Sequence, residues 1–512
     1  MLNVFLNRNL RSAITSIFRL LYEELATHEN QRKGGSKMYR MEVDFLGEKA
    51  VPVEAYYGIH TARAIENFDV SRQKVHPELI RALAVVKQAA AESNMSIGLL
   101  DENIGNAIFQ AAEEIAGGKF IEAFIVDAFQ GGAGTSTNMN MNEVIANRAI
   151  EFLGGKKGDY HLVHPLDHVN MSQSTNDVYP TALRMAAIRL LLPLSEACAV
   201  LQGALQRKEE EFGGVLKLGR TEMQDAVPIT LGQEFSAWAE AISRDRWRLY
   251  KVEERLRKVN LGGTAVGTGI NVPRKYVYTV IERLRNLSGL GLARDENSID
   301  GTQNADVFVE VSGMLKACAV TMIKISGDLR LLSSGPKGGF GEIRLPDLQA
   351  GSSIMPGKVN PVIPEMVTQV AYQVIASDMA ITLAVQSGQL ELNAFYPLIA
   401  VNLLPAMESM AKALRLLAEK CILGIQAMPE VCLKHLKNST ALATVLSPLI
   451  GYEHAAILAK KALASGRPVI DILLEEKVFS QEEITELLQV QQLTRTGVIG
   501  KDSKWQRRTE NE

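Results

Sequence analysis

Apolar residues recur at every third or fourth position from about residue 180 to about residue 430, in segments of about 25 to 30 residues. Short turns that contain glycine or proline separate these segments. In the segment 233–259 the apolar stripe comprises Phe235, Trp238, Ile242, Leu249, Val252, Leu256 and Val259. Such a stripe lets neighbouring helices interlock at shallow angles, so the pattern predicts a bundle of long helices. Asp245 interrupts the stripe, and we expect a neighbouring helix to supply its polar partner.

The segment 360–392 differs, because its sequence VIPEMVTQVAYQVIASDMAITLAV places apolar residues on nearly every face of a helix. A helix at the surface of a protein does not tolerate this pattern. A helix of about 30 residues is about 45 Å long, so burying all of its faces requires helices from other copies of the chain. The sequence therefore predicts an oligomer.

Changes in sequence texture divide the chain into a segment 1–41, a mixed helical domain 42–172, a long-helix domain 173–429 and a small helical domain with a tail, 430–512. The first 37 residues begin MLNVFLNRNLRSAITSIFRLL, which is free of acidic residues and has spaced arginines, as import sequences do. An upstream extension is the alternative that we favour. The fold class that these patterns predict is all-α, with three domains.

Composition excludes several classes of protein. The chain has 512 residues, 46% of them hydrophobic and 22% charged, with a net charge of −3. These values favour neither a disordered chain nor a protein that binds nucleic acid. The longest apolar runs are too short for a membrane span. Four scattered cysteines without a CxxC motif are typical of reduced, buried thiols in a cytoplasmic protein.

One loop has an unusual composition. LQAGSSIMPGKVNPVIPE (348–365) gathers glycines, serines, a lysine and prolines between two helical segments. Asn360, followed by Pro361, is a good helix start. The N–H groups of a helix start and the charge of Lys358 together favour binding of a carboxylate or of a developing oxyanion. A flexible linker between helices is the alternative.

Other loops have matching character: GGAGTSTNMN (131–140), HVNMSQSTND (168–177) and GRTEMQDAVP (219–228). Each one alone is also typical of capping and turn chemistry. Together they offer many neutral donors and few fixed anions, which suits a small dicarboxylate or amino-acid substrate. They contain no spacing of metal ligands, no dinucleotide fingerprint and no nucleophile elbow, so we expect no metal site and no required cofactor. Activation by a divalent cation is not addressed by these motifs.

The loop GSSIMPGKVNP resembles the signature of the aspartase/fumarase superfamily, and GGAGTS, SQSTND, GRTEMQDAVP and GGTAVGTGIN resemble its other blocks in the same order. The resemblance covers about residues 42 to 485. It implies a homotetramer with a central helical core, in which loops from three subunits form each active site. It also implies anti elimination across Cα–Cβ of a succinyl compound to give fumarate.

The resemblance assigns roles to individual residues. Ser352 matches the catalytic base, and Lys358 and Asn360 stabilise the enediolate-like intermediate. The residues that bind substrate are Thr135, Ser136, Ser174, Thr175, Asn176 and Thr221. Arg63 looks like a substrate residue of aspartases, although a surface or structural arginine is the alternative.

Smaller differences between the sequence blocks of aspartases and fumarases indicate the leaving group. HVNMSQSTND, KVNPVIPE and AVQSGQLELN resemble aspartases more than fumarases, so we expect release of ammonia from L-aspartate, with hydration of fumarate as the alternative. Glu222 stands where fumarases carry histidine, and a carboxylate there suits a substrate ammonium. An ion pair with Arg220 or with another chain is its alternative role.

Other features of the sequence bear on the alternatives to this interpretation. The segment LNAFYPLI (392–399) departs from the LNVMEP expected of an aspartase, so we expect the fine shape of the pocket to differ from that of other aspartases. Lyases that act on argininosuccinate or adenylosuccinate resemble these blocks less well. A structural descendant without activity is disfavoured, because Ser352, Lys358 and Asn360 are all present.

Overall fold

The computed structural model describes residues 38–497. The prediction that residues 1–37 form an upstream extension rather than an import sequence lies outside the described residues. Residues 39–41, which we placed in the N-terminal segment, belong to strand β1 (Tyr39–Asp44).

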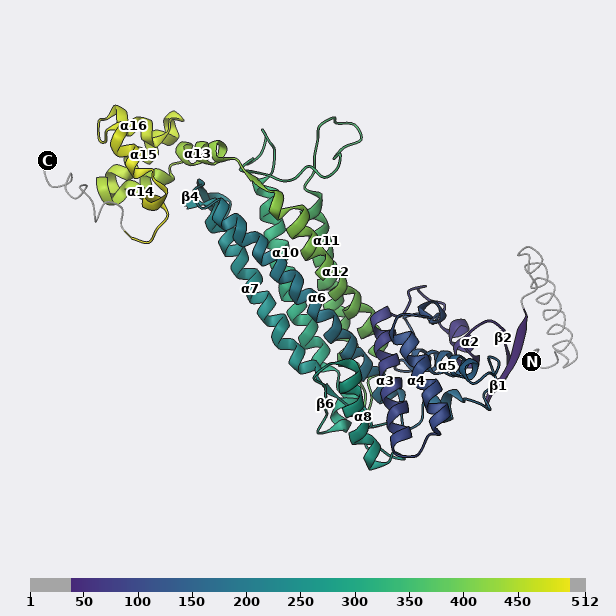
Figure 1. Ribbon diagram of the computed structural model, residues 1–512. Helices are drawn as coiled ribbons and strands as arrows, with labels where there is room; N and C mark the ends of the chain where they lie inside the picture. Colours follow the sequence, from purple (N-terminus) through teal and green to yellow (C-terminus); the bar gives the residue numbers. More distant parts are fainter. Residues whose placement is uncertain (1–37, 498–512) are drawn as a thin grey trace, which may run out of the picture.

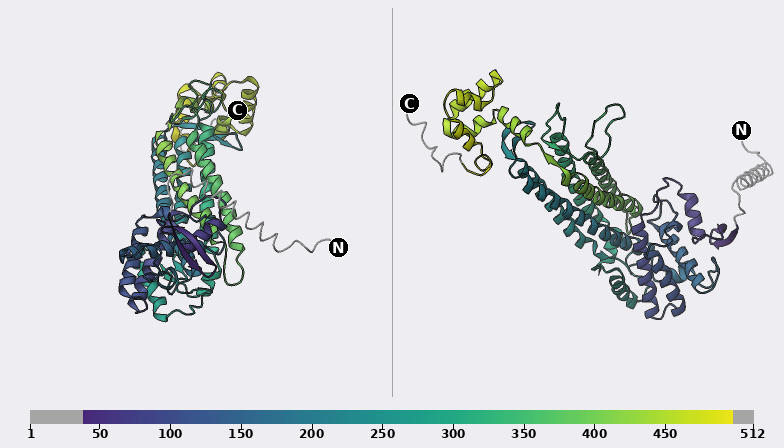
Figure 2. Two further views of the ribbon diagram at one scale, coloured as in Figure 1. Left: turned by 90° about the vertical axis from the view of Figure 1, so that its right-hand side faces the viewer. Right: turned by 45° about the horizontal axis from the view of Figure 1, so that its top comes forward.

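The molecule is elongated, with a long helical bundle between two smaller helical parts (Figure 1). The N-terminal part lies at one end of the bundle and the C-terminal part at the other, and both further views keep this arrangement (Figure 2). The predicted three-domain, mostly α-helical fold is therefore confirmed. Short two-stranded sheets, which the sequence patterns did not predict, join some of the helices.

The N-terminal part begins with the antiparallel hairpin of β1 and β2 (Gly47–Pro52). Its other elements are α2 (Ile59–Asn67), α3 (Pro77–Ser96), α4 (Glu102–Ala116), η1 (Ile121–Ala123), α5 (Thr135–Phe152) and the π-helix η2 (Pro165–Val169). Apolar faces of α3, α4 and α5 form a core that continues into the bundle. The start of the bundle is therefore packed firmly against this part.

The bundle consists of α6 (Thr175–Glu211), α7 (Leu231–Leu256), α10 (Asp306–Leu332), α11 (Val362–Gln386) and α12 (Tyr396–Lys420). Between α7 and α10 lie β5 (Lys258–Val259), α8 (Arg274–Ser288), β6 (Ala293–Arg294) and α9 (Ser298–Gln303). Among residues 38–497, α6 alone is long and apolar enough to cross a membrane by length and composition. Other parts of the molecule bury 56% of its most apolar stretch, as expected for the core helix of a bundle.

The helix predicted over 233–259 is α7, and every residue of its predicted apolar stripe is buried. The prediction for Asp245 was wrong in one respect. Its partner is Arg248 at 2.6 Å, one turn along the same helix, because the guanidinium reaches back to the buried carboxylate.

Helix α11 is shorter than the predicted segment 360–392, and its outer face is apolar. Tyr372, Met379 and Leu383 on this face are each at least half exposed in the single chain. Three large apolar side chains at helical spacing form the kind of patch that marks a protein–protein contact. This exposed face matches the surface that the predicted oligomer would cover.

The C-terminal part has a hydrophobic core of its own. Its elements are η3 (Ile422–Gly424), β8 (Gln426–Ala427), α13 (Pro429–Asn438), α14 (Ala441–Ile450), α15 (Tyr452–Ser465), α16 (Val469–Glu475), α17 (Gln481–Leu487) and α18 (Val490–Leu493). Leu218 of the hairpin formed by β3 (Leu216–Thr221) and β4 (Gln224–Thr230) is part of that core. This hairpin is therefore packed against the C-terminal part.

Candidate active site

The first group of predicted residues lies where α5 begins. Thr135 and Ser136 occupy its first turn, after Gly134, which has a φ of 93°. A Cβ atom on Gly134 would lie 2.3 Å from the ring of Tyr179, so only glycine allows the turn to pack against α6. The helix start, with its partial positive charge, is thereby fixed beside the bundle.

The second group lies where α6 begins. Ser174 and Asp177 form a capping box, in which the Ser174 hydroxyl accepts the N–H of Asn176 and Asp177 accepts the N–H of Ser174. The side chain of Asn176 donates to the carbonyl of Ala265 at 2.7 Å. Thr175 is largely buried, with 8% of its surface exposed. The first and second groups of predicted residues therefore lie at the starts of two α-helices that follow each other in the chain, α5 and α6.

The buried carboxylate of Asp177 also holds a glycine-rich loop. Its Oδ2 accepts the N–H groups of Gly262 and Thr264, both at 3.0 Å. Burial raises the pKa of Asp177 to about 6, although these hydrogen bonds oppose the shift. The loop 262–271, which was recognised only as a sequence block, is in this way attached to the start of α6.

Lys87 was missed by the sequence analysis. It is fully buried in α3, and its ammonium donates to Asn170 Oδ1 at 3.0 Å and to Gln173 Oε1 at 2.9 Å. Asn170 Oδ1 also accepts from Asn138 and Asn142 of α5. Burial lowers the pKa of Lys87 to about 7. The available signal was a lysine in the alanine-rich, apolar stretch RALAVVKQAAA.

Thr221 and Glu222 lie at the exposed tip of the β3–β4 hairpin. Glu222 and Met223 have φ values of 53° and 63°, which is the geometry of a tight two-residue hairpin turn. The alternative of an ion pair between Glu222 and Arg220 was wrong. Arg220 instead makes two bonds to Glu342, at 2.7 and 3.1 Å, because β3 directs it toward the buried carboxylate.

The third group lies in the loop between β7 (Ile343–Arg344) and α11. Ser352 Oγ accepts the N–H groups of Ile354 at 3.2 Å and Met355 at 3.0 Å. Two N–H donors at one oxygen favour its negatively charged form. Ser352 and Lys358 both line a hollow of about 370 Å³ within this loop.

The prediction that Asn360 caps the following helix was wrong. Helix α11 begins at Val362 without a side-chain cap, and Asn360 Nδ2 instead donates to the carbonyl of Gly351 at 2.8 Å. Gly351 N–H donates to the carbonyl of Lys358 at 2.7 Å. These two bonds close the base of the loop.

Arg63 lies on α2, which packs against α5, the helix that carries Thr135 and Ser136. Its guanidinium makes two 2.9 Å bonds to Asp44 and one to the carbonyl of Gly47. Within the single chain, its contacts thus fix the β1–β2 hairpin to α2.

The predicted residues do not form one site within one chain. Helix α6 has 37 residues, so about 55 Å separates Thr175 at its start from the β3–β4 hairpin after its end. Figure 1 shows α5 at one end of the bundle, and β4 and the loops before α11 near the other end. The single chain therefore carries two half-sites, one with Thr135 and Asn176, the other with Thr221 and Ser352.

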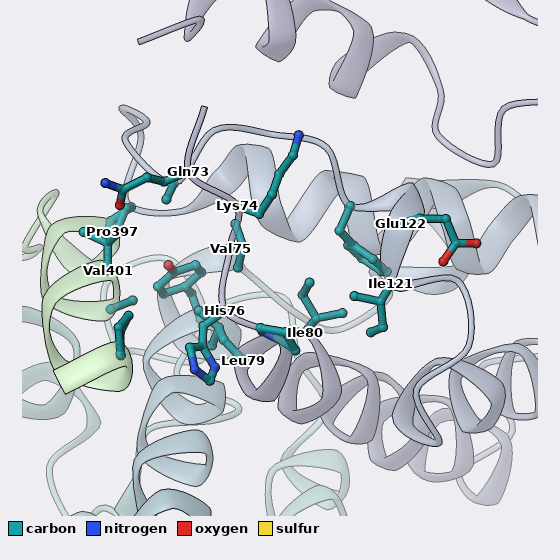
Figure 3. A pocket seen from close by; sticks show the side chains of 16 residues that line it. Gln73, Lys74, Val75, His76, Leu79, Ile80, Ile121, Glu122, Pro397 and Val401 are labelled. Atoms are coloured by element: carbon teal, nitrogen blue, oxygen red, sulfur yellow. The ribbon is translucent and has the colours of Figure 1, made fainter. Parts of the chain in front are cut away.

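A separate cavity of about 560 Å³ contains none of the predicted residues (Figure 3). Val75, Leu79, Ile80 and Ile121 line it, and His76 beside them is paired with Glu408 at 3.2 Å. Its walls are mainly apolar, with Gln73, Lys74 and His76 among the polar side chains, and it lacks the group of hydroxyl and amide donors that the predicted loops supply.

The unexpected segment 392–399 lies behind the first half-site. Tyr396 begins α12, and its buried ring contacts the rings of Tyr179 and Phe308. The ring of Tyr179 also packs against Gly134, which directly precedes Thr135. The departure from the expected LNVMEP therefore changes the side chains that pack behind the start of α5.

Comparisons with known proteins agree with this architecture. A family model described as Lyase matches residues 47–376, and one described as Fumarase C C-terminus matches residues 442–495. The chain is 47% identical over 468 residues to an aspartate ammonia-lyase of Bacillus subtilis, which covers 91% of this chain and 98% of that protein.

Two solved structures are also similar. A fumarate lyase:delta crystallin from Brucella melitensis bound to cobalt is 50% identical, with a TM-score of 0.87 over 90% of this chain and 100% of the other. A class II fumarase from Schistosoma mansoni is 33% identical, with a TM-score of 0.85 over 89% of this chain and 99% of the other.

Proposed function

This chain belongs to the lyase family of the aspartases and class II fumarases, and from that premise we propose that it is an aspartate ammonia-lyase. It converts L-aspartate to fumarate and ammonia. The observation that carries the proposal is 47% identity to an aspartate ammonia-lyase over nearly the whole length of both proteins.

Ser352 is the general base of the proposed reaction. Its oxygen takes the proton from Cβ of aspartate, and the electron pair is delocalised into the neighbouring carboxylate as an enediolate-like dianion. The C–N bond then breaks, the nitrogen leaves with its electron pair as ammonia, and the Cα–Cβ double bond of fumarate forms. The N–H groups of Ile354 and Met355 support the assignment, because they stabilise a deprotonated serine oxygen.

The dianion needs positive charge that is already in place. Lys358 supplies a full charge beside Ser352, and the starts of α5 and α6 supply partial charges with the side chains of Thr135, Ser136 and Asn176. This set of donors balances the substrate charge without a cofactor, which we therefore propose is not required.

Glu222 distinguishes ammonia release from hydration of fumarate. We propose that its carboxylate faces the ammonium of aspartate. In malate the corresponding group is a neutral hydroxyl, and its electrostatic attraction to a nearby carboxylate is much weaker than that of an ammonium. Exposure of Glu222 at a hairpin tip supports this role, because the tip is free to contact a substrate held by another copy.

The proposed assembly is a homotetramer whose active sites each draw on three subunits. The distance of about 55 Å along α6 supports an assembly, because a small substrate cannot contact both half-sites of one chain, so at least two subunits must contribute to each site. The exposed apolar face of α11 supplies a contact surface. We also propose a cytoplasmic location, which the four buried free cysteines support.

The test is an assay of purified protein with L-aspartate and, separately, with L-malate. Equal release of fumarate and ammonia from L-aspartate, with little fumarate from L-malate, is the expected result. Fumarate from L-malate alone would make the protein a fumarase.

A further inference from the structure

Glu342 lies at the centre of a buried group of charges near the second half-site. Its side chain is fully buried, and its carboxylate accepts two bonds from Arg220, at 2.7 and 3.1 Å. Lys217 lies 3.2 Å away, and His435 Nδ1 of α13 lies 2.9 Å away. A buried carboxylate that faces basic groups of β3 and α13 joins its own segment firmly to both of them.

The two cations on β3 link this group to the hairpin. Arg220 directly precedes Thr221 and also lies over the ring of Phe340, 4.3 Å from its centroid. Lys217, at the other end of the strand, makes a second ion pair with Glu234 of α7 at 2.7 Å. Because the tip itself is exposed, the position of the Thr221–Glu222 turn is set mainly by the contacts of Arg220, which directly precedes it in the chain.

The main chain of Glu342 is attached to the bundle and to the C-terminal part. Its N–H donates to the carbonyl of Leu332, and its carbonyl accepts the N–H of Met428, both at 2.9 Å. The next two residues form β7, which pairs with β8 and leads into the loop of Ser352. One residue therefore contacts the hairpin through its side chain and fixes the base of the catalytic loop through its backbone.

We propose that Glu342 is a positioning residue that holds the Thr221–Glu222 turn in a fixed place relative to the base of the Ser352 loop. The inference rests on the proposed function for the roles of Glu222 and Ser352. Glu342 does not touch substrate, and acts through Arg220.

Steady-state kinetics with L-aspartate test the role. Glu342→Gln removes the charge that holds Arg220, so KM should rise about 10-fold or more, with a smaller fall in kcat. Glu342→Asp keeps the charge and should recover part of the loss. The matched control is Glu234→Gln, which removes the other partner of Lys217 but leaves the Arg220–Glu342 pair; its KM should stay within about twofold of wild type.

A double-mutant cycle separates positioning from general destabilisation. If Glu342 acts through the hairpin tip, Glu342→Gln should raise KM much less in a Glu222→Gln background than in wild type. Equal increases in both backgrounds would overturn the proposal. Arg220→Lys keeps the positive charge but loses the paired bonds, and gives the same test if Glu342→Gln does not fold.

Hydrogen exchange gives a readout that does not depend on activity. The amides of 216–230 should exchange faster in Glu342→Gln or Arg220→Lys than in Glu234→Gln, and unchanged exchange would overturn the inference. Failure of the wild type to act on L-aspartate would overturn the proposed function instead, while this comparison would still decide the role of Glu342.

Discussion

The ammonium of Lys87, which is fully buried, lies 3.0 Å from Oδ1 of Asn170, in the loop that leads into α6. Gln173 directly precedes Ser174, and Asn170 lies four residues before Ser174, so this buried cation sets the path of the loop that carries the first half-site. The same oxygen of Asn170 accepts from α5, which links the two helix starts.

Replacing Lys87 should therefore impair substrate binding. Lys87→Met leaves Gln173 Oε1, which is partly buried, without its 2.9 Å donor, and the loss of one such hydrogen bond costs about 0.5–1.5 kcal/mol. We expect KM for L-aspartate to rise about 10-fold as the loop shifts to recover a partner. The control is Lys119→Met, at an exposed ion pair with Glu114, which should leave KM unchanged. Equal kinetics for the two variants would contradict the role of Lys87.

Ser352→Ala should abolish turnover while the fold and assembly persist. Loss of a general base typically costs about 10²–10⁴-fold in rate. The neighbouring Ser353 is exposed, so Ser353→Ala is the matched control and should keep most of its kcat. Initial rates of fumarate formation, with gel filtration to confirm assembly, make the comparison. A Ser352→Ala enzyme with near-normal kcat would remove this serine from the mechanism.

Glu222→His should shift the preference away from the amino substrate. The change removes a negative charge that faces the ammonium, so kcat/KM for L-aspartate should fall about 10- to 100-fold. The rate with L-malate should not fall in parallel. Glu254→His, on α7, is a control for the same chemical change far from the hairpin tip. An unchanged KM and kcat for L-aspartate would exclude Glu222 from recognition.

Glu143 should make stability depend on pH. Its carboxylate accepts the N–H groups of Gly58, His60 and Thr61 at the start of α2, and burial raises its pKa to about 7. Between about pH 4.5 and pH 7 the folded state holds a proton that the unfolded state has lost, so this contribution to stability falls as pH rises.

Glu143→Gln removes that titration. The Tm of wild type minus the Tm of the variant should decrease between pH 5 and pH 7.5, as measured by thermal unfolding. The pKa of Asp177 is also raised, but Asp177 titrates in both proteins, so its effect cancels in the difference between the two Tm values. A constant difference between the two Tm values would show that Glu143 does not titrate in this range.

The long-helix architecture was predictable from sequence because apolar spacing along α7 is a local property. The chemistry of the Ser352 loop was indicated by its composition and by its resemblance to a known signature. The partners of buried charges were not predictable. Arg220 pairs with a glutamate 122 residues away, and Lys87 with amides more than 80 residues away, and such pairings depend on how distant segments pack.

The central claim is an aspartate ammonia-lyase whose half-sites come from different copies of the chain. Mixing two inactive variants tests it most directly. Ser352→Ala and Asn176→Ala, which lie in different half-sites, are unfolded and refolded together, and fumarate formation from L-aspartate is measured near 240 nm. About one quarter of the sites then take both intact residues from different subunits, so about a quarter of wild-type activity should return. Mixed tetramers that stay as inactive as each parent, beside an active refolded wild type, would contradict the shared site.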